Sequence, residues 1–262
     1  MNILETIIAH KKIEVEKRRS AVPITELEQQ EFFSRKTLSL KQFLLDETRT
    51  GIIAEFKRRS PSKGTINDTA AVTEVTAAYA KYGASCLSVL TDHDFFGGTA
   101  NDLKQARINA VPILRKDFII DAYQVLETKA MGADVLLLIA ACLTPGKVKE
   151  LASLAKEIQV EVLLEIHNEE ELQHICAEIS LIGINNRDLK TFRVDINRSV
   201  ELSKKIPADK IIITESGISD VETIKRLKQQ GFKGFLIGEN FMKEKDPGEA
   251  FRNFVEKLNC QK

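Results

Sequence analysis

Short apolar runs recur along the chain at fairly regular intervals. Eight runs rich in aliphatic residues start about 20 to 35 residues apart: GIIAEFK, CLSVLT, VPILRK, ADVLLLIA, VEVLLEI, LIGIN, KIIITE and GFLIG. Apolar residues fill most of each run instead of alternating with polar ones, which is typical of strands that are covered on both faces. The pattern therefore predicts eight buried, parallel strands.

Segments with helical spacing of apolar residues separate these runs. Three of them end in glycine, the usual residue just past a helix end: 69–83, 122–132 and 221–231. Neighbouring parallel strands need a crossover, which is usually a helix. Eight such units predict a closed (β/α)8 TIM barrel. An open doubly wound sheet is the competing architecture, but the GxGxxG of a Rossmann nucleotide site is missing after the early strands.

About 48 residues precede the first predicted strand. The segment ILETIIAHKKIEVEKRR places Leu4, Ile7, Ile8 and Val15 at helical spacings and carries dense charge elsewhere. Such a helix could be a solvated cap on the barrel bottom, or it could reach over the active face. No Gly/Ser-rich or Pro-rich linker divides the chain, so we expect one domain over residues 1–262, with about 1–48 as an N-terminal helical extension.

Composition narrows the class of protein. The 262 residues include 38 Lys and Arg and 38 Asp and Glu, so the formal net charge is zero, without the basic surplus usual in nucleic-acid-binding proteins. Four scattered cysteines without a CxxC pair fit a reducing compartment. The amino terminus has no signal-peptide pattern, and no apolar run approaches the roughly 18 residues of a membrane span. We expect a cytoplasmic protein without nucleic-acid or membrane partners.

Polar residues stand at the carboxyl ends of five predicted strands. They are Glu55 and Lys57, Lys116, Glu165, Asn185, and Glu215 with Ser216. Any one of them could simply mark where a strand leaves the core. In a barrel, however, these ends converge on the face that carries the chemistry. Two lysines and three glutamates together predict a site for proton transfer, with Glu55 and Lys57 on one face of their strand.

The last two predicted units indicate a phosphate site. Gly217 follows the seventh strand, and Gly238 and Glu239 follow the eighth. Glycine lets backbone N–H groups approach a phosphate, and a short helix after Gly238 would add its positive end.

Other motifs carry weaker signals. The four histidines lack metal-ligand spacing such as HExxH, and we expect no metal. Asp92-His93-Asp94 could imitate a metal site, but a polar turn is the simpler interpretation. Ser216 does not lie in a GxSxG hydrolase motif. The charged stretch KRRSPSKG is either a solvated loop or a mobile lid.

AEFKRRSPSKG, LTDHDFFGG, LRKDFIID, GINNRDL, TESGIS and FLIGENFM together resemble the indole-3-glycerol-phosphate synthase family over most of the chain. The resemblance implies a single-domain barrel with an N-terminal extension and a carboxy-lyase of tryptophan biosynthesis without metal or organic cofactor. The implied substrate is 1-(2-carboxyphenylamino)-1-deoxyribulose 5-phosphate. The implied products are indole-3-glycerol phosphate, carbon dioxide and water. The family leans monomeric.

By resemblance, the catalytic set is Glu55, Lys57, Lys116, Glu165, Asn185, Glu215 and Ser216. Arg187 resembles a residue at the anthranilate end of the site. The phosphate-binding positions fall on Ser60, Gly217, Gly238 and Glu239, the last through its backbone. Asn240 and His93 depart from the family's usual residues at positions that carry no chemistry.

The chemistry of the implied reaction accounts for these residue types. Lys116 would be the general acid for ring closure, and Glu165 would stabilise positive charge at the anthranilate nitrogen. Lys57 and Glu55 would serve the dehydration, although the sequence does not decide which lysine serves which step. Two alternatives stay open: another phosphate-binding barrel enzyme, such as a phosphoribosylanthranilate isomerase or a lysine Schiff-base aldolase, and a non-catalytic sugar-phosphate-binding barrel.

Overall fold

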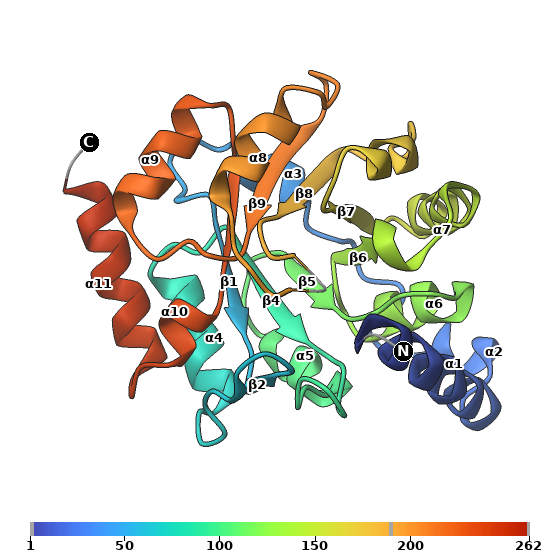
Figure 1. The fold of residues 1–262 in the computed structure, drawn as a ribbon. Coiled ribbons are helices and arrows are strands. Elements are labelled where there is room, and N and C mark those ends of the chain that lie inside the picture. The colour runs from blue at the N-terminus through green and yellow to red at the C-terminus, as the bar shows by residue number, and fades with distance from the viewer. Residues whose placement is uncertain (1–2, 189–190, 261–262) are drawn as a thin grey trace.

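Eight parallel strands close into a barrel in the computed structural model, which describes residues 3–188 and 191–260. The order around the barrel is β1-β10-β9-β8-β7-β6-β5-β4, so each barrel strand pairs with its neighbours in sequence and the last pairs with the first. Helices surround the strands (Figure 1). The predicted (β/α)8 TIM barrel is therefore confirmed, and the open doubly wound sheet is excluded.

The barrel strands coincide with the eight apolar runs. They are β1 (Ile52–Phe56), β4 (Cys86–Leu90), β5 (Ile113–Lys116), β6 (Val135–Ile139), β7 (Glu161–Ile166), β8 (Leu181–Asn185), β9 (Ile211–Glu215) and β10 (Gly234–Ile237). A small antiparallel hairpin, β2 (Arg59–Ser60) and β3 (Gly64–Thr65), follows β1. This hairpin lies mostly within the stretch KRRSPSKG, for which the sequence predicts either a solvated loop or a mobile lid.

The outer helices are α4 (Val72–Lys81), α5 (Ala100–Ala106), α6 (Ala122–Ala130), α7 (Pro145–Glu157), α8 (Ile196–Ser203), α9 (Val221–Gln229), α10 (Glu239–Met242) and α11 (Pro247–Asn259). A 3₁₀ turn, η1 (Ala140–Cys142), precedes α7, and another, η2 (Glu170–His174), stands where the crossover from β7 to β8 would place an α-helix. Only residues 167–180 make that crossover, too few for a long helix with two loops. Within the described ranges, no helix combines the length and apolar character that a membrane crossing requires.

The N-terminal extension covers both ends of the barrel. It comprises α1 (Ile3–Ala21), α2 (Ile24–Leu27) and α3 (Leu40–Leu45). Leu40 and Leu44 of α3 are buried against the lower barrel interior, so α3 closes the bottom. Ile3 and Ile7 of α1 instead line the cavity at the opposite end. Of the two interpretations of the first helix, the structure favours the one in which it reaches over the mouth.

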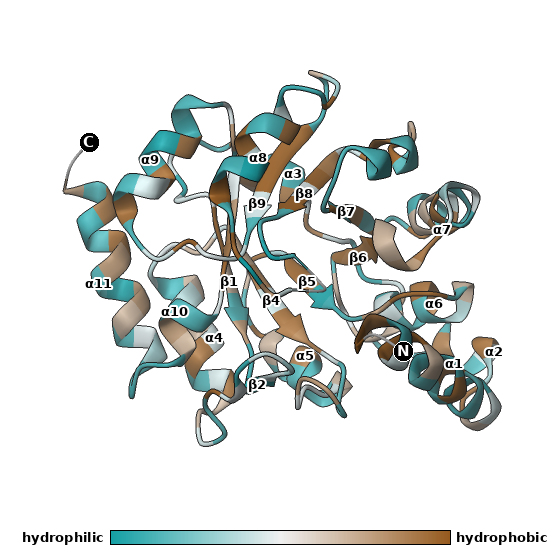
Figure 2. Cartoon of the chain, in the orientation of Figure 1, coloured by the Kyte–Doolittle hydropathy of each residue, from teal (hydrophilic) through white to brown (hydrophobic). Residues whose placement is uncertain are grey.

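Alternation along each strand separates two apolar layers. Inward side chains such as Ile53 and Leu163 fill the barrel, whereas Ile52 and Leu164 pack between the strands and the outer helices. Figure 2 accordingly shows mostly hydrophobic strands inside helices that carry mixed faces. Pairing places Asn185 opposite Glu215 at the carboxyl ends. The last inward positions of the strands therefore form one polar layer above the apolar interior.

Candidate active site

A cavity of about 590 Å³ opens at the carboxyl ends of the barrel strands. All twelve residues predicted for the site line it: Glu55, Lys57, Ser60, Lys116, Glu165, Asn185, Arg187, Glu215, Ser216, Gly217, Gly238 and Glu239. They come from six strands and the segments that follow them. The fold thus brings together side chains as far apart in sequence as Glu55 and Glu239.

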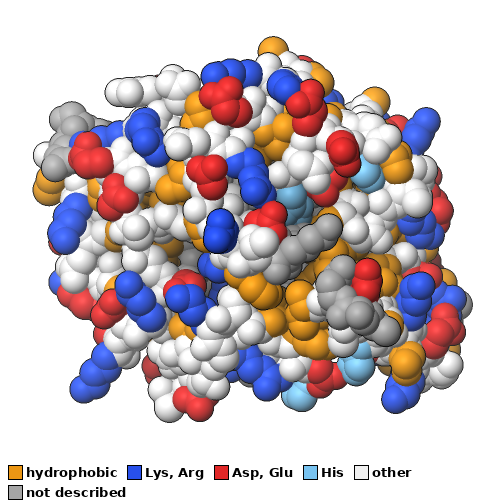
Figure 3. Space-filling model, in the orientation of Figure 1, with side chains coloured by type: hydrophobic (Ala, Val, Ile, Leu, Met, Phe, Trp, Pro, Cys, Tyr) orange, Lys and Arg blue, Asp and Glu red, His pale blue; other side chains and the backbone are white. Residues whose placement is uncertain are grey.

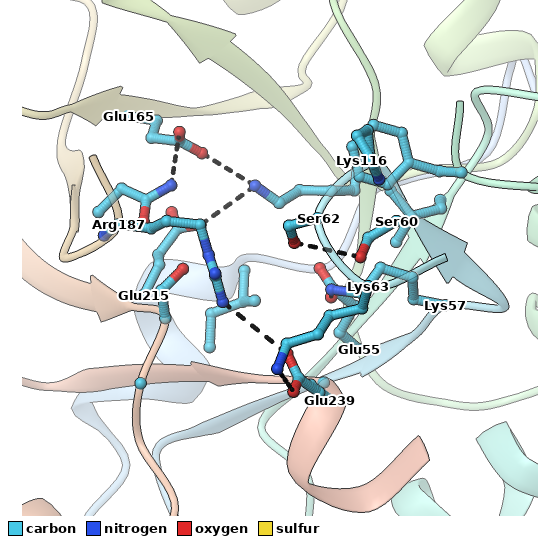
Figure 4. A pocket seen from close by; sticks show the side chains of 18 of the residues that line it. Glu55, Lys57, Ser60, Ser62, Lys63, Lys116, Glu165, Arg187, Glu215 and Glu239 are labelled. Carbon is cyan, nitrogen blue, oxygen red and sulfur yellow. Dashed lines mark hydrogen bonds and ion pairs between the residues drawn. The ribbon is translucent and has the colours of Figure 1, made fainter. Parts of the chain in front are cut away.

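Lys116 occupies the centre of this polar layer. Its Nζ lies 2.9 Å from Oε2 of Glu165 and 3.1 Å from Oε2 of Glu215, as Figure 4 shows. Burial by itself lowers the pKa of Lys116, but the facing carboxylates outweigh it, and the pKa lies above its usual value. The side chain retains 15% exposure to the cavity. Lys116 is therefore a charged proton donor that an incoming molecule can reach.

The two carboxylates beside Lys116 differ in protonation. Burial by itself raises the pKa of Glu165, but Lys116, His167 and Asn185 hold that pKa well below its usual range. Burial raises the pKa of Glu215 to about 7, with Glu165 adding to the rise and Lys116 opposing it. Glu165 is therefore an anion at neutral pH, whereas Glu215 can gain or lose a proton there.

Glu55 and Lys57 form the pair expected from their spacing. Nζ of Lys57 lies 2.5 Å from Oε1 of Glu55. The glycines of neighbouring strands make room for the buried carboxylates. A Cβ at Gly238 would lie 2.4 Å from Oε1 of Glu55, and one at Gly183 would lie 2.5 Å from Oε1 of Glu215. Gly238, chosen from sequence for phosphate binding, is therefore also needed for the position of Glu55.

The loops after β9 and β10 form the polar end of the cavity. Ser216 and Gly217 both have positive φ, 69° and 77°, which turns the backbone sharply after Glu215. Such a conformation costs a non-glycine residue about 1 kcal/mol or more. The carboxylate of Glu239 does not stand alone: Lys63 lies 3.4 Å from it and Arg187 lies 3.8 Å away (Figure 4). Phosphate binding here, and anthranilate contact by Arg187, stay predictions.

Apolar side chains form a further wall that the sequence did not identify. Leu4 and Ile7 of α1 line the cavity together with Phe96, Phe118 and Ile139. The Phe96 and Phe118 rings lie 6.0 Å apart. Figure 3 shows hydrophobic side chains gathered near the middle of this face, among charged side chains of both signs. Apolar residues carry no chemical signature in sequence, so only the fold reveals this wall.

The side chains of the Asp92-His93-Asp94 turn point to different partners. Asp92 turns inward to Lys11 of α1, at 2.8 Å, while His93 Nδ1 lies 2.8 Å from Asp94. Within residues 3–188 and 191–260, no group of three or more His, Cys, Asp or Glu side chains is arranged to hold a metal ion. Lys11 itself is fully buried. The turn is therefore part of the contact between α1 and the barrel.

His167 is a charged neighbour of the site that the sequence did not single out. It follows β7, two residues after Glu165, and is 6% exposed. Its Nε2 lies 3.1 Å from Oε1 of Glu165. The spacing Glu-x-His at a strand end was the available signal, but a search for metal-ligand spacing passes over it.

Comparison with known proteins gives a consistent family. The family model described as indole-3-glycerol phosphate synthase matches residues 4–254. A protein of that name from Bacteroides thetaiotaomicron is 49% identical over 98% of this chain and 99% of its own length. Another of that name, from Polaromonas sp. strain JS666, is 42% identical over 95% of this chain and 96% of its own.

Solved structures support the same fold at low sequence identity. A 3-hexulose-6-phosphate synthase superposes with a TM-score of 0.63 at 13% identity, covering 80% of this chain and 100% of that one. The tryptophan synthase alpha subunit of Legionella pneumophila superposes with a TM-score of 0.59 at 13% identity, covering 84% of this chain and 96% of that one. At such identities the likeness concerns the barrel alone.

Proposed function

This chain belongs to the indole-3-glycerol phosphate synthase family, and we propose that the cavity at the barrel mouth carries out the reaction of that family through the polar side chains described above. The chain is a carboxy-lyase of tryptophan biosynthesis. It converts 1-(2-carboxyphenylamino)-1-deoxyribulose 5-phosphate into indole-3-glycerol phosphate, carbon dioxide and water.

The position of Lys116 between an apolar and a polar end of the cavity is the observation that carries the proposal. The aryl group of the substrate fits the wall formed by Phe96, Phe118 and the α1 side chains. The phosphate fits the loops around Gly217 and Gly238, where glycine allows close approach of the backbone. This orientation places the ketone near Lys116. The ketone oxygen is the only part of the substrate that must accept a proton during ring closure.

Ring closure is the first chemical step. The ring carbon that bears the carboxylate attacks the ketone, and Lys116 donates a proton to the developing alkoxide. Positive charge then builds at the anthranilate nitrogen, where the ionised Glu165 stabilises it. Glu215, with its pKa of about 7, can hold a proton near neutral pH and return it to Lys116 once the lysine has donated its own. Departure of carbon dioxide restores the aromatic ring.

Dehydration completes the indole. An acid must protonate the hydroxyl so that it leaves as water, and a base must remove one further proton. The Lys57–Glu55 pair supplies both, and Lys57 first holds the substrate carboxylate by its charge. Asn185 and Ser216 orient sugar hydroxyls and neighbouring side chains. Asn185 also donates to Oε1 of Glu165 at 3.0 Å, which fixes the carboxylate for its role in the earlier step.

The sequence and its resemblance to the family support a proposal for how the chain is organised. We propose that residues 1–262 act as a single domain and as a monomer in the cytoplasm, on a small phosphate-containing substrate and without a metal or organic cofactor. Sedimentation velocity on the purified protein tests the monomer. Full activity after chelator treatment and dialysis tests the independence from metal.

Incubation with the carboxyphenylamino substrate tests the function. Indole fluorescence and carbon dioxide should rise together, and the protein background is low because the chain has no Trp. Tight binding without release of carbon dioxide would instead indicate a non-catalytic sugar-phosphate-binding barrel. Trapping of a covalent adduct by borohydride would indicate a Schiff-base enzyme.

A further inference from the structure

We propose that His167 is a positioning residue: as an imidazolium, it keeps the Glu165 carboxylate ionised and correctly placed opposite Lys116. The proposal rests on the proposed function, because it assigns to His167 a role in the site where ring closure occurs. His167 does not line the cavity and so does not touch the substrate. It lies behind Glu165, where burial makes its charge effective.

Each ring nitrogen of His167 faces a carboxylate. Nε2 lies 3.1 Å from Oε1 of Glu165, close enough for an ion pair although the N–H is not aligned for a hydrogen bond. Nδ1 lies 3.3 Å from Oε2 of Glu171. A neutral imidazole has only one N–H, so one carboxylate would then face a lone pair. Both contacts are favourable only when the ring is protonated.

Glu171 is itself held in place, which makes it a fixed support for the ring. Its Oε2 accepts the backbone N–H of His167 at 2.7 Å, and its Oε1 accepts from the side chain of Asn168 at 3.1 Å. The backbone N–H of Glu171 in turn donates to Asn168 at 3.1 Å. The short turn η2 therefore forms a rigid clamp that points the imidazole at Glu165.

His167 also resolves the charge balance around Lys116. Two carboxylates, Glu165 and Glu215, share the single ammonium of Lys116. His167 supplies a second positive charge, and of the two carboxylates beside Lys116 it contacts Glu165. The opposite pKa shifts of the two carboxylates are consistent with this asymmetry, since His167 is among the groups that lower the pKa of Glu165, whereas burial raises that of Glu215.

The titratable groups around the imidazole favour its charged form. Glu165 of β7 and Glu171 of η2 face it directly, with Lys116 of β5 and Glu215 of β9 beyond Glu165. Cys142 of η1 lies near both Glu165 and Glu171, but burial raises the pKa of its thiol to about 12, so it stays neutral. Burial by itself lowers the pKa of His167, but its two carboxylates outweigh this and raise the pKa to about 9.

The sign of the pH dependence follows from that raised pKa. The stability that His167 contributes is complete below about pH 6.5, its usual pKa, and is lost as pH rises through about 9. Without the imidazolium, Glu165 would take up a proton at higher pH than before. The acidic limb of the activity profile should therefore move upward when the histidine is replaced by a neutral side chain.

His167→Gln and His174→Gln form a matched pair that tests this role. Both histidines are 6% exposed, but the ring nitrogens of His174 lie 2.9 and 3.0 Å from the backbone carbonyls of Leu143 and Glu171, where those of His167 face carboxylates. We expect His167→Gln to lower kcat by about 10- to 100-fold, the range that is typical when a residue that orients a metal-binding side chain is replaced. KM should change little, and the acidic limb of kcat/KM should shift to higher pH. His174→Gln should alter thermal stability alone.

A wild-type kcat and pH profile in His167→Gln would overturn the proposal, as would an equal change in His174→Gln. If His167→Gln does not fold, NMR titration of the wild-type protein decides, because only four histidines contribute signals. A His167 imidazole that stays protonated at pH 8 supports the role, and a neutral His167 ring at that pH overturns it; the spectrum of His174→Gln separates the signals of the two buried histidines. The titration also separates this proposal from the proposed function, since it reads protonation even if no indole is formed.

Discussion

Two buried lysine–carboxylate clusters lie side by side at the end of β5, and they serve different purposes. Consecutive residues contribute to them: Lys116 points into the cavity, whereas Asp117 pairs with Lys11 of α1 at 2.9 Å. Lys11 also lies 2.8 Å from Asp92 and 2.6 Å from Glu14. Carboxylates outweigh burial in both clusters and raise the pKa of each lysine.

Access to the cavity distinguishes the two. The Lys11 side chain is 0% exposed and closed in by its own helix, whereas Lys116 keeps 15% exposure and lines the cavity. Three carboxylates surround Lys11, while Lys116 faces two, and of these Glu165 also contacts His167 and Asn185. A perturbed lysine among carboxylates is thus not sufficient for catalysis, because a group that no substrate can reach can only stabilise the fold.

Removal of the Lys116 ammonium should give the largest effect. Lys116→Met keeps the length of the side chain and removes the proton donor, so we expect kcat to fall by about 10²- to 10⁴-fold. Stability should suffer less than the burial suggests, because His167 still pairs with Glu165 and Glu215 can take up a proton. Lys116→Arg should restore little activity, since guanidinium is a far weaker acid. Steady-state indole fluorescence on the three proteins measures this.

Removal of the Lys11 ammonium should act on stability instead. Lys11→Met leaves Asp92 buried without its cation, whereas Asp117 keeps Arg115 at 3.0 Å. Loss of one partner of a buried ion pair typically costs roughly 3–5 kcal/mol. Lys12→Met is the matched control, because Lys12 is exposed on the next position of the same helix and should cost almost nothing. Urea unfolding of both variants gives the difference. Equal free energies of unfolding would show that the buried cluster does not hold α1 to the barrel.

Lys57 should affect the products as well as the rate. If Lys57 serves dehydration, Lys57→Met should release carbon dioxide while indole appears about 100-fold more slowly. Glu55→Gln should give the same imbalance, because the two residues act as a pair. Parallel assays of carbon dioxide and indole fluorescence follow the two steps. Equal loss of both products in Lys57→Met would move this lysine to ring closure or carboxylate binding.

Gly238 gives the smallest expected effect and tests why glycine stands there. Gly238→Ala would place a methyl group 2.4 Å from Oε1 of Glu55, so the carboxylate must move. We expect kcat to fall by up to about 100-fold, the cost of a displacement of about 1 Å, along with a rise in KM. Gly146→Ala is the control, because a Cβ there meets nothing within 4 Å. A change in KM alone would restrict Gly238 to phosphate binding.

The sequence predicted the barrel well because its strands are encoded locally. Each apolar run contains one barrel strand, and the run LIGIN coincides with β8 from Leu181 to Asn185. The polar residues at strand ends were also identifiable, since convergence of these ends is a property of the fold. The crossover after β7 was less predictable: its apolar spacing suggests a helix, but its length allows only the 3₁₀ turn η2.

Contacts between distant segments could not be predicted. Lys11 has the sequence environment of a surface lysine, and its burial depends on where α1 docks relative to Asp92 and Asp117. His167 has no motif of its own, and its role depends on the turn that brings Glu171 back to the ring. In both cases the missing information is a distance across the fold, which residue types and spacings do not contain.

Single-turnover kinetics on Lys116→Met and Lys11→Met, with enzyme in excess and rates expressed per folded molecule, test the central claim most directly. The account predicts that Lys116→Met stays folded and loses at least about 100-fold in the rate of indole formation. It predicts that Lys11→Met loses stability and keeps a rate near that of the wild type. A stable Lys116→Met protein with a near-normal rate would contradict the assignment of Lys116 as the general acid.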